Sequence, residues 1–206
     1  MESIPSVDTT PRQLLADYYV EHGFDDDGGF SSKVVAIKFG NLFKLYLPNF
    51  DARRLAIRKH DIHHILTEYT PSSILGESEI GTWEIAAGTK KYWAALVLDA
   101  SAIMLGFVMS PSKIFNAFVR GRRTKSLYYD MIADEEAVNK TLKELRTMLL
   151  LDKYGKSCEK KFSDYVLFSG FLLLSALYAL LSFPIAPFVL VFSLIYSIKH
   201  KLSPST

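Results

Sequence analysis

Three of the five histidines lie in one short segment, His60-Asp61-Ile62-His63-His64. On a helix, His60 and His64 are one turn apart, so their imidazoles project from the same face and can share a metal ion. Asp61 lies at the edge of that face, where its carboxylate can supply an oxygen ligand or act as a base on metal-bound water. We therefore predict that His60, Asp61 and His64 are metal ligands and catalytic residues. The side chain of His63 points elsewhere, which predicts an indirect role or a surface position.

A further oxygen ligand is expected from the next helix. The segment Thr70-Pro71-Ser72-Ser73 breaks the first helix, and a helix that begins near Gly76 would bring Glu77 or Glu79 back toward the histidines. Two histidines with one or two carboxylates suit zinc and also iron. The sequence thus predicts a site for a divalent metal, with zinc favoured and iron as the alternative. The competing interpretation is a polar helix face with solvated histidines.

Three other classes of metalloprotein match the cluster in part. The metalloprotease motif has Glu after its first histidine, where this chain has the shorter Asp61. Membrane desaturases use a His-x-x-His-His box, which the clustered histidines reproduce, but they need several boxes and the rest of the chain offers only His22 and His200. His-Asp phosphohydrolases need a separate upstream histidine and a distal aspartate. His22 and Asp99 can fill those places, so this alternative stays open.

The surrounding sequence predicts a mainly α-helical domain with one small β-hairpin. Thr10-Pro11-Arg12-Gln13 is a helix start, with a capping Thr, Pro at the first position and Gln three residues after the cap. Residues 34–47 alternate as two short strands around Gly40-Asn41, a dipeptide suited to a tight turn. From Asp51 the apolar spacing becomes helical. Residues 92–110 are apolar and rich in small residues, which predicts a central buried helix.

The C-terminal region predicts a membrane anchor. Residues 165–183 form an uncharged run whose helix would be about 28 Å long, close to the ~30 Å hydrocarbon core. Pro184 and Pro187 interrupt it before a second apolar run, 188–198. Lysines flank both ends, which favours a helical hairpin with both ends on the cytoplasmic side. A single kinked span and a buried helix of a soluble fold are the alternatives. The basic run 120–123 is expected either to contact anionic lipid headgroups or to be a solvated helix end.

This gives two parts: a metal-binding helical domain in residues 1–155, and a membrane-anchoring hydrophobic hairpin with a short polar tail in residues 156–206. The localisation predicted is a membrane, with the N-terminal domain on its cytoplasmic side. The formal net charge is +2, and no stripe of Lys and Arg alternates with aromatic residues, so a nucleic-acid partner is not expected. The single cysteine, Cys158, excludes an internal disulfide and a cysteine-based zinc site.

The histidine segment followed by Glu77 resembles the motif of the coenzyme Q biosynthesis protein 4 family, in which His-Asp-x-x-His precedes a Glu by about a dozen residues. The stretch from Glu77 to Trp83-Glu84 is similar to the family's next helix, and Gly121-Arg122-Arg123 and residues 142–149 are similar to its C-terminal end. The resemblance covers roughly residues 12 to 152. The hydrophobic hairpin that follows is not part of the family's usual core, which indicates a divergent bacterial branch. The gap before Glu77 is one residue longer than in the family, which leaves Glu79 as the alternative ligand.

The resemblance implies a metal site beside a lipid-binding cavity. It implies a metal-dependent decarboxylase or oxidoreductase of ubiquinone or prenylquinone biosynthesis, which oxidatively removes the ring carboxyl of a polyprenylated hydroxybenzoate. The alternative is a non-catalytic protein that binds and presents such lipids to other enzymes of quinone biosynthesis. The expected partners are therefore a prenylated lipid intermediate, the membrane and those enzymes.

Overall fold

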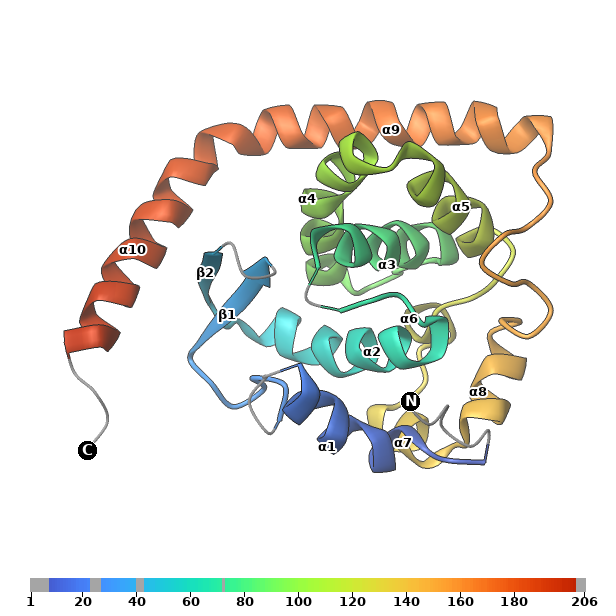
Figure 1. Ribbon diagram of the computed structural model, residues 1–206, viewed down its shortest axis with the longest axis horizontal. Coiled ribbons are helices and arrows are strands. Elements are labelled where there is room, and N and C mark those ends of the chain that lie inside the picture. Colours follow the sequence, from blue (N-terminus) through green and yellow to red (C-terminus); the bar gives the residue numbers. More distant parts are fainter. Residues whose placement is uncertain (1–7, 23–26, 40–42, 72, 203–206) are drawn as a thin grey trace.

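The computed structural model describes residues 8–22, 27–39, 43–71 and 73–202, which are mainly helical (Figure 1). One two-stranded antiparallel sheet accompanies the helices in these ranges, so the predicted mainly α fold with a small β-hairpin is confirmed. The elements in chain order are α1 (Pro11–Glu21), β1 (Val34–Phe39), β2 (Phe43–Pro48), α2 (Asp51–Thr67), α3 (Ile74–Ala87), α4 (Trp93–Met109), α5 (Pro111–Gly121), α6 (Leu127–Asp130), α7 (Asp134–Asn139), α8 (Leu142–Met148), α9 (Phe162–Ser182), the 3-10 turn η1 (Phe183–Ile185) and α10 (Ala186–Leu202).

Short polar residues set the helix starts near the site. In α1, the backbone N–H of Thr10 donates to Gln13 Oε1 at 2.8 Å, as the capping motif predicted. The helix expected near Gly76 begins two residues earlier, because Ser73 caps it and its Oγ accepts a hydrogen bond from the Gly76 N–H at 3.1 Å. β1 and β2 pair in an antiparallel register that joins Val34 to Pro48. The predicted turn at Gly40-Asn41 lies outside the described residues.

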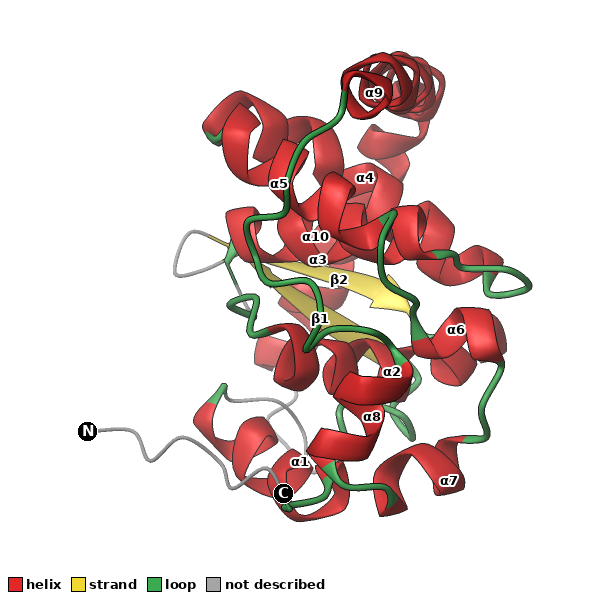
Figure 2. Cartoon of the chain, turned by 90° about the vertical axis from the view of Figure 1, so that its right-hand side faces the viewer, coloured by secondary structure: helices red, strands yellow, loops and turns green. Residues whose placement is uncertain are grey.

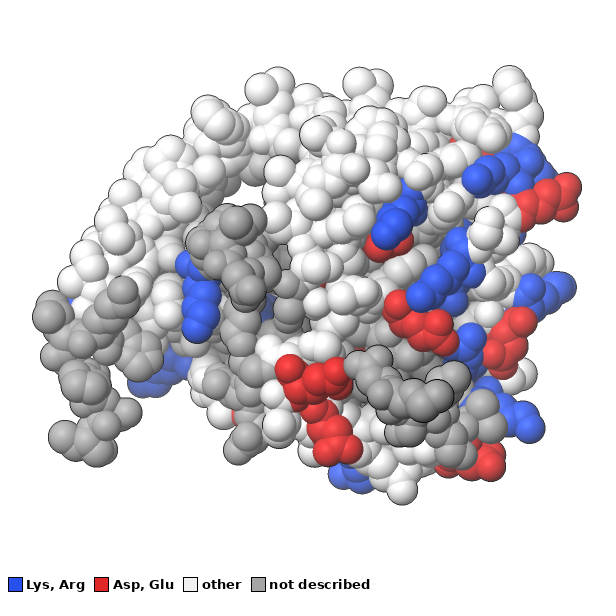
Figure 3. Space-filling model, viewed as in Figure 1, with Lys and Arg blue, Asp and Glu red and all other residues white. Residues whose placement is uncertain are grey.

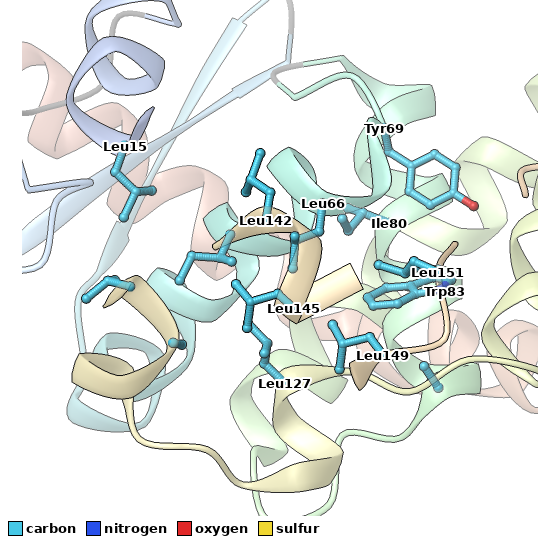
Figure 4. Packing of buried hydrophobic residues seen from close by; sticks show 14 of the residues in the cluster. Leu15, Leu66, Tyr69, Ile80, Trp83, Leu127, Leu142, Leu145, Leu149 and Leu151 are labelled. Carbon is cyan, nitrogen blue, oxygen red and sulfur yellow. The ribbon is translucent and has the colours of Figure 1, made fainter. Parts of the chain in front are cut away.

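One apolar core joins α1, α2 and α3 to the helices that follow α5 (Figure 4). α7, α8 and the residue after α8 supply four buried side chains, Val138, Leu142, Leu145 and Leu149. They belong to the same cluster as Trp83 of α3, which is fully buried and whose indole N–H donates to Thr124 Oγ1 at 2.9 Å. This core fixes α2 and α3 relative to each other, and those two helices carry the predicted ligands.

Small residues let α3 and α4 approach closely. A Cβ added at Gly106 would lie 2.2 Å from Ser78 Cβ, and one added at Gly81 would lie 2.9 Å from Asp99 Cβ. The Ser78 hydroxyl also donates across the interface to the Ala102 carbonyl at 2.7 Å. Because there is no room for a methyl group at this crossing, α4 sits directly against the helix that carries Glu77 and Glu84.

We expect Gly106→Ala to destabilise the fold by about 1–3 kcal/mol, because the new methyl group must push α4 away from Ser78. The matched control is Gly170→Ala in α9, where an added Cβ meets nothing within 4 Å. That change should be neutral or stabilising by up to about 1 kcal/mol through helix propensity. Thermal unfolding of the two variants measures the difference, and equal melting temperatures would contradict the tight α3–α4 contact.

The prediction that residues 92–110 form a central buried helix is only half right. Ala94, Ala95 and Ile103 are buried, but Val108 is 78% exposed and Met109 is 56% exposed. The reason is that the small side chains serve the contact with α3, whereas most of the larger apolar side chains lie on a face that the domain does not cover.

The C-terminal segment differs from the expected helical hairpin. α9 lies across α4 and α5, on the side of the domain away from α1, α7 and α8 (Figures 1 and 2). The chain then passes through η1 into α10 with a bend and does not fold back on itself (Figure 1). Pro184 and Pro187 occupy the first turns of η1 and α10, where a helix tolerates a missing N–H. α9, η1 and most of α10 together form one apolar helical stretch, Phe162–Lys199, which is long enough to cross a membrane.

The arginines of the basic run 120–123 bind other parts of the protein and do not form a fully solvated helix end, and the contact with lipid headgroups stays a prediction. Arg120 is buried and its Nη1 donates to the Thr67 carbonyl at 3.0 Å. Arg122 and Arg123 both pair with Asp164 in the first turn of α9, the latter at 2.6 Å. The run therefore ties α5 to α2 and α9.

Candidate metal centre

Helices α2 and α3 bring together His60, His64 and Glu77. The two Nε2 atoms are 3.2 Å apart, and Glu77 Oε2 lies 3.3 Å from His60 Nε2 and 3.6 Å from His64 Nε2. We call these three atoms the ligand triangle. Donor atoms about 2.0–2.1 Å from a tetrahedral zinc ion lie roughly 3.3 Å from one another. The triangle therefore has the size that zinc requires, and it leaves a further coordination position open.

The other ring nitrogens orient the two histidines. His64 Nδ1 lies 2.9 Å from the Tyr69 carbonyl oxygen, which can only accept a hydrogen bond. His60 Nδ1 lies 3.2 Å from both oxygens of Glu84. When each Nδ1–H donates to its oxygen partner, both Nε2 lone pairs point into the ligand triangle. Metal-binding histidines are held in this way by carboxylates and backbone carbonyls.

Glu84 is the central polar side chain beneath the triangle, and the sequence did not single it out as a site residue. It is fully buried and also contacts His63 Nδ1 at 2.5 Å. Burial alone would raise the pKa of Glu84. The charge of His60 and the hydrogen bonds from His60 and His63 outweigh the effect of burial, so the pKa of Glu84 lies below its usual range. Glu84 is therefore an anion. A signal existed in the sequence, because Glu84 follows Glu77 by two helical turns and so lies on the same face of α3.

His63 does not lie at the surface. It is fully buried, its Nδ1 contacts Glu84, and its Nε2 accepts a hydrogen bond from the Leu127 N–H at 2.9 Å. The predicted indirect role fits this position, because His63 contributes no atom to the ligand triangle. It connects Glu84 to the start of α6.

Asp99 of α4 approaches the same carboxylate. A ligand atom from each of Asp99, His60 and Glu84 lies within 4.8 Å of the other two. Burial and the negative charge of Glu84 raise the pKa of Asp99 well above its usual range, which favours its protonated form. Gly81 makes space for it, because a Cβ at that position would collide with Asp99. His22, the other residue that the phosphohydrolase interpretation requires, packs edge-to-face against Tyr18 with ring centroids 4.8 Å apart and belongs to neither group of ligand atoms.

Asp61 and Glu79 lie outside the ligand triangle. The buried Asp61 carboxylate faces α1, where Oδ2 accepts a hydrogen bond from the Tyr19 hydroxyl at 3.0 Å. Burial raises its pKa to about 6, although His60 and His64 oppose the shift. Glu79 lines a polar cavity of about 300 Å³ with Lys113 and Lys156.

An open surface groove of about 440 Å³ lies along α8. Neither the cavity nor this groove is lined by residues of the ligand triangle. Solvent reaches the triangle at its edge, where the side chains of His60 and Glu77 are 19% and 27% exposed. The lipid-binding cavity implied by the resemblance stays a prediction.

Metal binding at this site should release about one proton at neutral pH. Burial lowers the pKa of His60, but Glu84 and Glu77 raise it well above its usual range, so the metal-free imidazole is protonated. A metal needs the unprotonated ring, so affinity should rise about tenfold per pH unit below that pKa and level off above it. Titration calorimetry in two buffers of different ionisation enthalpy counts the released protons. A count of zero would contradict this arrangement.

No family model, curated protein or solved structure matches the chain.

Proposed function

We propose that this chain is a membrane-associated, metal-dependent protein of ubiquinone or prenylquinone biosynthesis that acts on a polyprenylated hydroxybenzoate. The observation that carries the proposal is the ligand triangle of His60, His64 and Glu77, whose donor atoms lie 3.2–3.6 Å apart. These residues match the motif through which the sequence resembles the coenzyme Q biosynthesis protein 4 family. In the favoured version the protein is an enzyme: the bond between the ring and its carboxyl breaks, the carboxyl leaves as carbon dioxide, and one atom of dioxygen forms the new ring C–O bond. The other oxygen atom becomes water with two electrons and two protons from an external reductant.

The residues around the ligand triangle support a catalytic role for the metal site. A divalent metal held there would supply a Lewis acid at a partly exposed position. Glu84 holds His60 in one orientation from beneath, and His63 holds Glu84. Asp61, with a pKa of about 6, can hold or release a proton near neutral pH on the adjoining face of α2.

The identity of the metal separates the two versions of the proposal. The size of the triangle suits zinc, but zinc has no redox chemistry and cannot pass electrons to an oxidant. Iron can, and two histidines with a carboxylate are a usual set for non-haem iron. Zinc therefore favours the alternative, a non-catalytic protein that presents prenylated lipids to other quinone-biosynthesis enzymes. Iron favours the oxidative decarboxylase. The phosphohydrolase interpretation has less support, because His22 stands apart from the other residues that it needs.

The test uses the full chain in lipid nanodiscs, loaded with iron or with zinc and given a polyprenylated hydroxybenzoate. Mass spectrometry follows loss of the carboxyl group and gain of one oxygen. Product from the iron-loaded parent chain, and none from the His64→Ala variant, supports the enzyme. If the parent chain and the variant both retain the lipid and neither forms product, the presenting role is supported. If the lipid is neither retained nor converted, both versions fail.

The long apolar helix supports a membrane location, and we place the N-terminal domain on the cytoplasmic side. Lys160 and Lys161 precede the apolar stretch, and Lys199 and Lys201 follow its uncharged part. Positive residues at both ends are retained on the cytoplasmic side. An impermeant thiol reagent applied to sealed vesicles, with Ser157→Cys in a Cys158→Ser background, reports the side on which the domain lies.

A further inference from the structure

One side of α9 is fixed to the domain. The inward residues follow one another by three or four positions, as in a packing stripe. Phe168 is buried against Phe115 and Phe118, with ring centroids 4.9 and 5.2 Å apart. At the start of the stripe Asp164 pairs with two arginines, and further along the Tyr178 hydroxyl donates to the Val97 carbonyl at 3.1 Å. This stripe thus contains the polar residues Asp164, Ser175 and Tyr178.

The other sides of α9 carry no charge and face outward. Adjacent residues show the contrast: Leu174 is 68% exposed and Ser175 is 5% exposed. The outward side chains include Leu173, Leu180 and Leu181. Such a one-sided helix differs from an isolated span, which contacts lipid all round.

α10 repeats the arrangement on the other side of the bend. Ser193 Oγ accepts a hydrogen bond from the Tyr46 N–H of β2 at 3.0 Å, and the rings of Tyr46 and Tyr196 are 5.1 Å apart. Phe188 and Leu194 are 76% and 62% exposed on the outward side. The outer edge formed by α9 and α10 shows no charged side chain along most of its length, whereas charged side chains gather on the right-hand and lower parts of this view (Figure 3).

A crossing of the bilayer conflicts with these contacts. The stretch Phe162–Lys199 has 38 residues, about 57 Å of helix, nearly twice the ~30 Å hydrocarbon core. α5 lies alongside α9 and carries the exposed Lys113. If α9 crossed while docked, α5 and this lysine would enter hydrocarbon, which is costly for a charge. A crossing therefore requires α9 to leave the domain, whereas a helix parallel to the membrane keeps every contact.

We propose that α9 and α10 lie in the plane of the membrane, with their outward Leu, Val and Phe side chains in the acyl region of one leaflet, and do not cross it. The partner is the lipid leaflet. Lys160, Lys161 and Lys199 bracket the uncharged run where anionic headgroups would meet them. This arrangement does not depend on the ligand triangle or on the proposed substrate, so either proposal can fail without the other.

The test is photolabelling of the unmodified full chain in vesicles that contain phospholipids with a photoreactive group, placed either near the headgroup or at the end of the acyl chain. Mass spectrometry then maps the labelled residues. We expect at least about fivefold more label on Leu174 than on Ser175, because only one side meets lipid at a depth of about 5–10 Å. Leu173, Ile185 and Leu194 should all prefer the shallow probe.

Three results would overturn the proposal. Equal label on Leu174 and Ser175 would mean that lipid surrounds α9, as in a span. Strong label on Ile185 from the deep probe alone would mean that the bend reaches the middle of the bilayer. Absence of label on α9, with cross-links between its outward residues in two chains, would mean that a second copy covers this face.

Discussion

Replacing His64 by alanine is expected to lower metal affinity by at least about a hundredfold, because a binding free energy on the order of 10–16 kcal/mol is shared among few ligands. Among the described residues only His60 and Glu77 share this group of ligand atoms with His64, so the change leaves two of the three ligands. His60→Ala should have the same effect. Glu77→Gln should weaken binding less severely, because the amide oxygen keeps a donor atom but loses the charge. Elemental analysis of dialysed protein and competition with a chelator measure these losses.

Two matched controls test the geometry. Glu79→Gln changes a carboxylate two residues from Glu77 that faces Lys113 and Lys156 in a separate cavity, so metal content should stay unchanged. Asp61→Asn keeps an oxygen that can accept the hydrogen bond from Tyr19 and lies outside the triangle, so it too should retain the metal. If Glu79→Gln empties the site while Glu77→Gln does not, the ligand triangle is wrong.

The part of the site that the sequence could predict is the part that depends on helical spacing. His60 and His64 lie one turn apart, and their shared face follows from the geometry of a single helix. Glu77 required one further step, the break at Pro71, which limits how far the chain can travel before it returns. Both inferences use contacts between residues close in sequence.

The rest of the site depends on how distant helices pack. Asp61 was expected beside His64, but its carboxylate bonds to Tyr19, and the position of α1 is not encoded in the α2 sequence. Asp99 reaches Glu84 because Gly81 allows α4 to approach α3 closely. The local sequence of Arg122 and Arg123 indicates a basic surface run. In the fold, both pair with Asp164, which lies some forty residues later in the chain. Local patterns do not specify such partners.

The bend between α9 and α10 shows another reason why the sequence alone did not predict the fold. Two prolines in an apolar run suggest a reversal when the run is considered alone. In the fold, a proline at the start of a helix costs little, so α10 can begin directly after η1. Whether the chain bends or reverses depends on the surfaces against which the two helices can pack. Here α9 packs against α4 and α5, and α10 packs against β2.

His63→Ala is expected to destabilise the fold by about 3–5 kcal/mol, although the histidine spacing predicted a minor role for this residue. The side chain is fully buried and fills the space between Trp83 and Tyr128, with ring centroids 5.0 and 4.9 Å away. Its loss leaves a cavity, deprives Glu84 of one of its two histidine partners and leaves the Leu127 N–H without its acceptor. Chemical denaturation followed by circular dichroism measures the change.

Metal content separates this effect from loss of a ligand. Because His63 supplies no atom to the triangle, the folded fraction of His63→Ala should still bind close to one metal per chain, with affinity lowered by at most about 10–100-fold through the weaker support of Glu84 and His60. His22→Ala serves as the histidine control, since that ring is only half-buried against Tyr18 and should contribute about 1 kcal/mol or less. If His63→Ala unfolds at the same denaturant concentration as the parent chain, the buried Glu84–His63–Leu127 connection does not hold the fold. If His63→Ala removes the metal while His64→Ala keeps it, the roles of the two histidines must be exchanged.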